Sequence, residues 1–212
     1  MKNESAFLFS LAISPDTEIL TSVRELKLRL GKELGRNYGS INSLAHITLF
    51  TFWASMNDYQ KILKKIEAIL AGLDPFELKF SGFAFFPPKP LYTFYIEPDR
   101  ISGEQIIKYC KKIHTNCDAR FKRKYSLVNR VRKDPHMSVG RDLFESDVLA
   151  CNAIANEGSK NLLLAILLLF GDLMKAKVNT ILLILFHYLV KNILKVNNYL
   201  YFKCLTQRTF VI

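Results

Sequence analysis

The chain has 212 residues, of which half are hydrophobic and 23% are charged, the ordinary balance of a globular protein. This length allows one large domain or two small lobes that share a core. The formal net charge of +11 suits an anionic ligand such as a phosphate ester, RNA or an anionic membrane surface. No apolar run reaches the about eighteen residues of a clean membrane span, so a membrane association is not expected.

The N-terminal part of the chain predicts an alternation of strands and helices. Residues 7–13 form an apolar run typical of a buried strand, and no charged segment with a cleavage site marks a signal peptide. Asp16 or Thr17 can cap a helix that runs to about Leu34. Residues 43–52 are rich in β-branched and aromatic side chains and predict a second strand, and helical spacing returns over residues 57–70.

The alternation continues through the middle of the chain. Strands are expected at residues 76–86 and 91–98, on either side of a proline-rich turn. Ser102 is expected to cap a helix through Ile113, and residues 136–140 predict a short strand after a basic segment. The order β-α-β-α-β-β-α-loop-β predicts a mixed α/β (α+β) fold.

The basic segment between residues 119 and 133 holds seven Lys or Arg residues and no acidic residue. Aromatic side chains lie among these cations, a pattern that can follow a phosphate backbone and stack bases. A solvated basic loop is the alternative interpretation. The residues that could contact RNA are Arg120, Lys122, Arg123, Lys124 and Tyr125.

The cysteines give no sign of a metal site. The four of them form no CxxC pair and no Cys/His cluster with zinc-ligand spacing. We therefore expect free thiols in a reducing cytoplasm, with no metal and no cofactor, in a protein that is a monomer. The four residues are Cys110, Cys117, Cys151 and Cys204.

The C-terminal part differs in composition from the rest. We expect a two-lobed domain over residues 1–160 and an atypical apolar tail over residues 161–212. Residues 162–170 and 181–190 are apolar on every face and predict helices rather than half-buried strands. Only residues 199–202 offer a further short strand, so the second lobe could be incomplete.

Two tetrapeptides share the pattern histidine, apolar, hydroxyl, apolar. Residues i and i+2 of a strand point to the same face, so each histidine shares a face with a hydroxyl. A neutral imidazole can take a proton from an attacking oxygen while a protonated one donates to the leaving oxygen, and the hydroxyls can bind phosphate oxygens. The tetrapeptides are His46-Ile47-Thr48-Leu49 and His136-Met137-Ser138-Val139.

These paired motifs, about 90 residues apart, resemble those of the two-histidine (2H) phosphoesterases, a group that includes 2',5'-RNA ligases and cyclic phosphodiesterases. Pro135, His136, Ser138 and Arg141 also match the group's form P-H-x-[TS]-hydrophobic-x-R. The resemblance covers residues 5–145. It implies a two-lobed fold with one motif strand per lobe around a central cleft, and action on 2',3'-cyclic phosphates or 2',5'-linked RNA.

The resemblance assigns a role to each matching residue. His46 and His136 would be the catalytic pair, and Thr48, Ser138 and Arg141 would bind the substrate phosphate without a metal. Arg141 has the wrong parity on an ideal strand, so it reaches the phosphate only if the strand ends or bulges near Gly140.

Other interpretations of the same residues stay open. An RNA- or nucleotide-binding module without turnover would explain the basic segment, and a membrane-associated protein would explain the apolar tail. Both motif histidines could also match by chance. His114, at the end of a predicted helix, and His187, in an apolar run, are expected to be structural. Phe50, Phe52 and Tyr92 could line the cleft, although aromatic strand residues are more often core.

Overall fold

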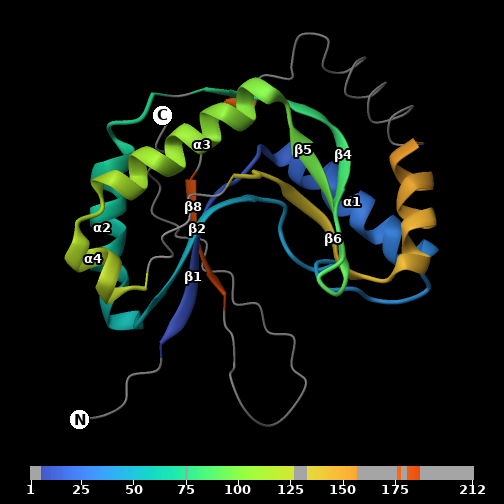
Figure 1. Cartoon of the computed structure of the whole chain (residues 1–212), viewed down its shortest axis with the longest axis horizontal. Helices are drawn as coiled ribbons and strands as arrows, with labels where there is room; N and C mark the ends of the chain where they lie inside the picture. The colour runs from blue at the N-terminus through green and yellow to red at the C-terminus, as the bar shows by residue number, and fades with distance from the viewer. Residues whose placement is uncertain (1–5, 75, 127–132, 157–175, 178–180, 187–212) are drawn as a thin grey trace.

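The computed structural model describes residues 6–74, 76–126, 133–156, 176–177 and 181–186. Its centre is a six-stranded sheet in which the strands follow the order β4-β5-β6-β2-β1-β8, with antiparallel neighbours throughout (Figure 1). The strands are β1 (Phe7–Ile13), β2 (Ile47–Ala54), β4 (Phe80–Phe86), β5 (Tyr92–Pro98), β6 (Met137–Leu143) and β8 (Ile181–Phe186).

The sheet consists of two halves that meet at a narrow junction. β8, β1 and β2 form the first half, and β4, β5 and β6 form the second. Within each half the strands pair along most of their length, whereas β2 and β6 share one pair, Ile47 with Met137. The predicted mixed α/β fold with one motif strand in each lobe is therefore confirmed. The cleft between the lobes stays a prediction.

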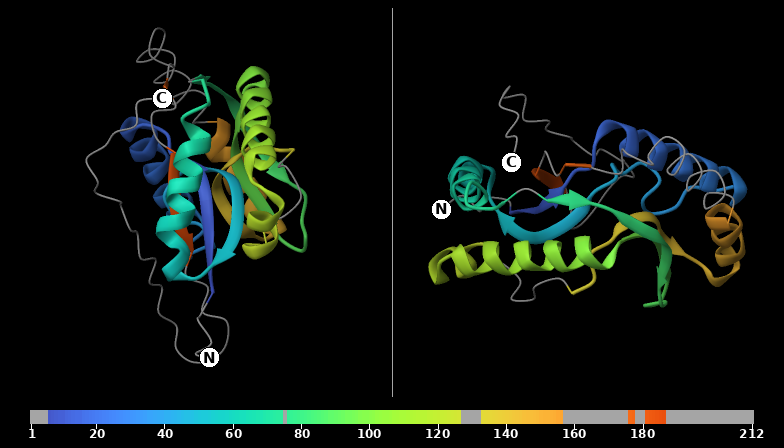
Figure 2. Two further views of the ribbon diagram at one scale, coloured as in Figure 1. Left: turned by 90° about the vertical axis from the view of Figure 1, so that its left-hand side faces the viewer. Right: turned by 90° about the horizontal axis from the view of Figure 1, so that it is seen from above.

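Helices lie on both sides of this sheet. Figure 2 shows α1 and α3 on opposite sides of the strands. The two-stranded ladder of β3 (Glu77–Leu78) with β7 (Ala176–Lys177) lies apart from the main sheet. The helices are α1 (Thr17–Glu33), α2 (Tyr59–Leu70), α3 (Arg100–Asn116), α4 (Ala119–Lys124) and residues 148–156, with short 3-10 turns η1 (Met56–Asp58) and η2 (Glu145–Asp147).

The hydrophobic core runs across the junction. Ile13, Ile47, Met137 and Ile96 are paired in one row across four strands and are all buried. α1 packs against β6, where a Cβ added to Gly140 would lie 3.2 Å from a Leu30 methyl group. α1 connects β1 to β2, two strands of the first half, but it packs on the second half. The two halves therefore share a helix as well as the sheet.

The first two predicted elements are confirmed. β1 spans the predicted residues, and Asp16 caps α1 by accepting a hydrogen bond from the Ile19 amide at 2.8 Å. The strand predicted from residue 43 begins only at Ile47. The preceding amides are used in turns instead, with Ile41 N–H donating to Tyr38 and Ser43 N–H donating to Ser40.

Two predictions in the middle of the chain are wrong. The helix predicted to start at Ser102 is capped by Asp99, whose carboxylate accepts from the Ser102 amide at 2.7 Å, so Ser102 lies inside α3. The basic segment is not wholly a loop, because Asp118 caps α4 by accepting from the Phe121 amide. In both places an aspartate with extended backbone supplied the cap.

The prediction of a helix over residues 181–190 is wrong for residues 181–186, which form β8 along the edge of β1. A short, continuously apolar run fits a buried strand as well as a helix, and β1 offers an edge that needs a partner. Residues 162–170, residues 199–202, His187 and Cys204 lie outside the described residues. Among the helices that the structure describes, none is long and apolar enough to cross a membrane.

Candidate active site

The two motif histidines have the same local geometry. Each is the residue before a motif strand, and each places its Nδ1 2.9 Å from a carbonyl oxygen two residues earlier, that of Leu44 for His46 and that of Asp134 for His136. A carbonyl oxygen only accepts hydrogen bonds, so Nδ1 carries the proton and the lone pair of the neutral ring lies on Nε2. The second-half motif thus repeats the first.

The junction brings the two motifs together. Continuing the Ile47–Met137 register by one residue at each end sets His46 opposite Ser138, and Thr48 opposite His136. Ile47 and Met137 point into the core, so these four polar side chains lie on the other face, where all are half-buried. The two histidines are diagonal neighbours there, with Cα atoms roughly 7–8 Å apart.

Both motif strands carry a bulge directly after the hydroxyl residue. In β2, Thr48 pairs with Ala12 and Phe50 with Leu11, which leaves Leu49 as the extra residue. In β6, Ser138 pairs with Tyr95 and Gly140 with Phe94, which leaves Val139 as the extra residue.

An extra residue shifts the alternation of the strand by one. Arg141 therefore takes the parity of His136 and Ser138 rather than that of Met137, and its side chain is exposed. The bulge near Gly140 on which the predicted role of Arg141 depends is therefore present, and the contact of Arg141 with a phosphate stays a prediction. The corresponding residue of the first motif is Thr51.

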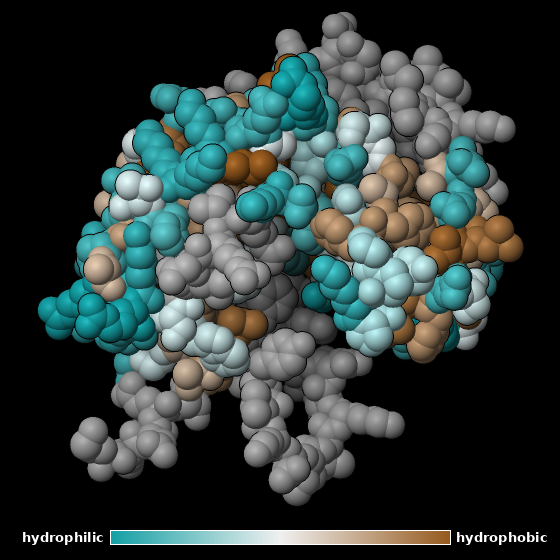
Figure 3. All heavy atoms as spheres, viewed as in Figure 1, coloured by the Kyte–Doolittle hydropathy of each residue, from teal (hydrophilic) through white to brown (hydrophobic). Residues whose placement is uncertain are grey.

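Two aromatic residues that the sequence did not single out lie against His136. The Phe86 ring meets the His136 ring edge-on, with the two ring centroids 4.7 Å apart. The Tyr95 centroid lies 5.4 Å from that of His136 and 4.2 Å from that of Phe86, on which Tyr95 stacks. The sequence showed the strand alternation of the two segments. It did not show that Tyr95 pairs with Ser138 or that the Phe86 ring contacts His136. In Figure 3 apolar side chains gather where β4 and β5 lie, whereas α3 and α4 present hydrophilic surface. Of the aromatics expected to line a cleft, Phe50 and Phe52 are in the core.

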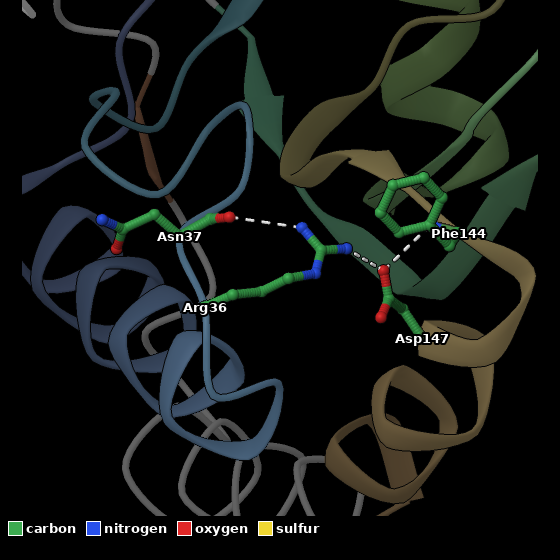
Figure 4. Close-up of polar contacts among 4 residues, drawn as sticks. All are labelled: Arg36, Asn37, Phe144 and Asp147. Carbon is green, nitrogen blue, oxygen red and sulfur yellow. Dashed lines mark hydrogen bonds and ion pairs between the residues drawn. The ribbon is translucent and has the colours of Figure 1, made fainter.

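The connection that leads to His46 is fastened to the second half. Gly39 N–H donates to the Arg141 carbonyl at 3.1 Å, and Ser40 Oγ donates to the Val139 carbonyl at 2.8 Å. Figure 4 shows the Arg36 guanidinium paired with the Asp147 carboxylate beside the Phe144 ring. These contacts place residues 36–40 along β6, so the approach to the first motif is positioned by the second.

The basic residues of α4 lie away from the histidines. Trp53, at the far end of β2, donates its backbone N–H to the Tyr125 carbonyl at 2.9 Å. Trp53 lies seven residue steps along the strand from His46, roughly 23 Å at 3.3 Å per step. Tyr125 is 5% exposed, so its ring packs in the core instead of lying open for stacking. The other candidates are the half-buried Lys122 and the exposed Arg120, Arg123 and Lys124.

The remaining described histidine has a structural environment. His114 lies in α3 and stacks on Phe50 at 6.4 Å, and burial lowers its pKa below the ordinary value. Cys110, Cys117 and Cys151 are buried and are reduced thiols. Within the part of the chain that the structure describes, no three His, Cys, Asp or Glu side chains are grouped so that they could hold a metal ion.

Comparison with known proteins gives one family match. The family described as the 2'-5' RNA ligase superfamily matches residues 15–162, more than half of the chain. Among solved structures, Usb1 from Kluyveromyces marxianus is similar at 13% identity and a TM-score of 0.37, over 72% of this chain and 81% of that one. No curated protein matches. The extent of the family match shows that this chain belongs to the 2'-5' RNA ligase superfamily of 2H phosphoesterases.

Proposed function

We propose that this protein acts on RNA-type phosphodiesters, either hydrolysing a 2',3'-cyclic phosphate or forming and cleaving a 2',5' linkage. His46 and His136 are the acid–base pair of this proposal, and the chemistry needs no metal. The pairing of Ile47 with Met137 is the observation that carries it, because it puts both motifs at one junction with their polar side chains on one face. Membership of the superfamily supports the substrate class.

The proposed reaction uses the repeated geometry of the rings. The phosphate lies between the histidines, and one neutral Nε2 takes the proton of an attacking water or ribose hydroxyl as the new P–O bond forms. The other ring, protonated, donates its Nε2 proton to the ribose oxygen that leaves phosphorus. Thr48 and Ser138 donate hydrogen bonds to the non-bridging oxygens, and Arg141 adds a positive charge as they become more negative.

The aromatic pair beside His136 supports a nucleotide substrate. A base attached to the ribose at the junction can stack on a ring, and such stacking tolerates every base. Phe86 and Tyr95 are half-buried and buried, so Phe86 offers the more accessible ring. The base therefore lies over the second half in this proposal.

A second candidate function is RNA binding without turnover. The exposed side chains of Arg120, Arg123 and Lys124, the last ion-paired with Asp58 at 2.8 Å, favour it, because they could hold a strand that extends along β2 from the junction. Binding that depends on phosphate contacts falls steeply with salt. RNA several nucleotides long should then bind more tightly than a mononucleotide at low salt, and a triple charge reversal in α4 should abolish that difference.

The test of catalysis is turnover of a 2',3'-cyclic nucleotide with EDTA present. The wild-type protein should release a nucleotide monophosphate, and His46→Ala and His136→Ala should each remove most of the activity. His114→Gln is the matched control, since His114 contacts β2 from the core side. Activity that survives the loss of both motif histidines would refute the proposal, and salt-sensitive RNA binding without any turnover would favour the second candidate.

A further inference from the structure

Lys27 is buried although it lies in the middle of an otherwise amphipathic surface helix. It is 1% exposed, and its Nζ donates to the Ser43 carbonyl at 2.8 Å and to Ser43 Oγ at 3.0 Å. Lysine is almost never fully buried unless its charge is paired or hydrogen-bonded, because the loss of hydration is costly. The contact with Ser43 is therefore a specific interaction and not a by-product of packing.

The hydrogen bonds continue from Ser43 into the second half of the sheet. Ser43 Oγ donates to the Ser40 carbonyl at 2.9 Å, and Ser40 Oγ donates to the Val139 carbonyl at 2.8 Å. We name Lys27, Ser43, Ser40 and the Val139 carbonyl the lysine–serine chain. One end holds the turn that leads to His46, and the other end is next to Ser138. The serines thus link the turn before His46 to β6, and Lys27 ties this link to α1.

We propose that Lys27 is a positioning residue, which fixes the turn before His46 and so sets the place of that histidine relative to His136. The inference rests on the proposed function of the two histidines. β2 and β6 share a single residue pair, so the ladder alone defines their spacing weakly. Arg36 and Gly39 fasten the start of the connection, whereas Lys27 fastens its end, three residues before His46.

The surroundings of Lys27 do not favour its positive charge, so the ammonium does not serve to stabilise the fold. Burial, together with the smaller effects of the positive charges of Arg141 on β6 and Arg24 on α1, lowers the pKa of Lys27 to about 7. Tyr38, whose hydroxyl donates to the Lys27 carbonyl, has a pKa raised by burial and stays neutral.

The unfolded chain therefore holds a proton that the folded protein has lost between pH 7 and about 10.5. The free energy of unfolding therefore rises with pH across that window through Lys27. Below pH 7 the folded protein is destabilised by the full free-energy cost of burying the ammonium. Removing the ammonium should therefore not lower stability at neutral pH, whereas it should misplace His46.

The experiment compares full-length Lys27→Met with Lys32→Met, which removes an exposed lysine of the same helix. With a 2',3'-cyclic nucleotide, Lys27→Met should lower kcat by at least about 10-fold with little change in KM, since a misplacement of about 1 Å can cost about 10²-fold. Its melting temperature at pH 7 should not fall below that of the wild type, and Lys32→Met should change neither quantity. Ser40→Ala breaks the chain at its other end and should lower kcat in the same direction.

Three results would overturn the inference: a folded Lys27→Met with wild-type kcat, a loss of kcat matched by a fall in melting temperature, or a Ser40→Ala with unchanged kcat. If Lys27→Met does not fold, Ser40→Ala decides. If the wild type turns over no substrate, the proposed function fails separately. Imidazole NMR signals then test Lys27, because those of His46 and His136 should shift in Lys27→Met and stay in place in Lys32→Met. Unchanged signals would refute the positioning role.

Discussion

The two halves of the sheet carry the same motif in different surroundings. In each half a histidine precedes the strand, a hydroxyl follows two residues later, and a bulge comes next. Ala12 lies beside Thr48 in the first half, whereas Tyr95 lies beside Ser138 in the second, and Thr51 stands where the second half has Arg141. Under the proposed function the shared features would supply proton transfer and the differences would supply recognition, so substrate orientation would depend on the second half.

The largest effect should come from the features that the halves share. His46→Ala and His136→Ala should each lower kcat by about 10²- to 10⁴-fold, because each removes one general acid–base group. The double variant should be little worse than either single one, since residues that act as a unit are not additive. Single-turnover rates with a cyclic nucleotide measure this. An additive double variant would mean that the two rings work independently.

The next effect should separate Arg141 from Thr51. Arg141→Met should lower kcat/KM by about 10- to 100-fold, in line with a hydrogen bond to a charged group of about 1.5–3 kcal/mol. Thr51→Ala, at the equivalent place in the first half, should change it by less than about 3-fold. Steady-state kinetics give both values. Equal losses would show that the bulge in β6 does not direct Arg141 to the substrate.

The aromatic residues of the second half should affect the binding of the substrate's base. Phe86→Ala should raise KM for a cyclic nucleotide by about 5- to 150-fold, from stacking worth about 1–3 kcal/mol per base. The baseless ribose 2',3'-cyclic phosphate serves as the control substrate, and its KM should stay the same. If both substrates lose affinity equally, Phe86 supports His136 instead of binding a base.

The smallest effects should come from the two hydroxyls, and they should be similar in the two halves. Thr48→Ala and Ser138→Ala should each lower kcat by about 2- to 10-fold, because a neutral hydrogen bond contributes about 0.5–1.5 kcal/mol. Ser146→Ala, an exposed serine of η2, is the control. A loss above 100-fold in only one of the two variants would assign phosphate binding to that half alone.

Local patterns predicted the parts of the fold that local physics determines. The apolar run of β1, the Asp16 cap of α1 and the parity of each motif follow from neighbouring residues alone. The caps at Asp99 and Asp118 were equally local but were passed over, in favour of Ser102 in the first case.

The site depends on pairing between segments far apart in the chain, which local patterns do not contain. The Ile47–Met137 register, the two bulges and the contact of Phe86 with His136 are all of this kind. β8 belongs with them, because an apolar run becomes a strand only where an edge such as that of β1 receives it. The sequence could nominate the candidate catalytic residues, whereas their mutual placement required the sheet.

The single pair at the junction gives the site an approximate two-fold axis that passes between Ile47 and Met137. Such a rotation exchanges the two histidines and exchanges the two hydroxyls. A phosphodiester centred on the axis has matching symmetry, because the rotation would exchange its entering and leaving oxygens and its two non-bridging oxygens. The forward and reverse reactions then use one geometry with the roles of acid and base swapped. Whether a bond is made or broken at this site would be decided by water and substrate concentrations, and Tyr95, Phe86 and Arg141 would tell the two sides of the substrate apart.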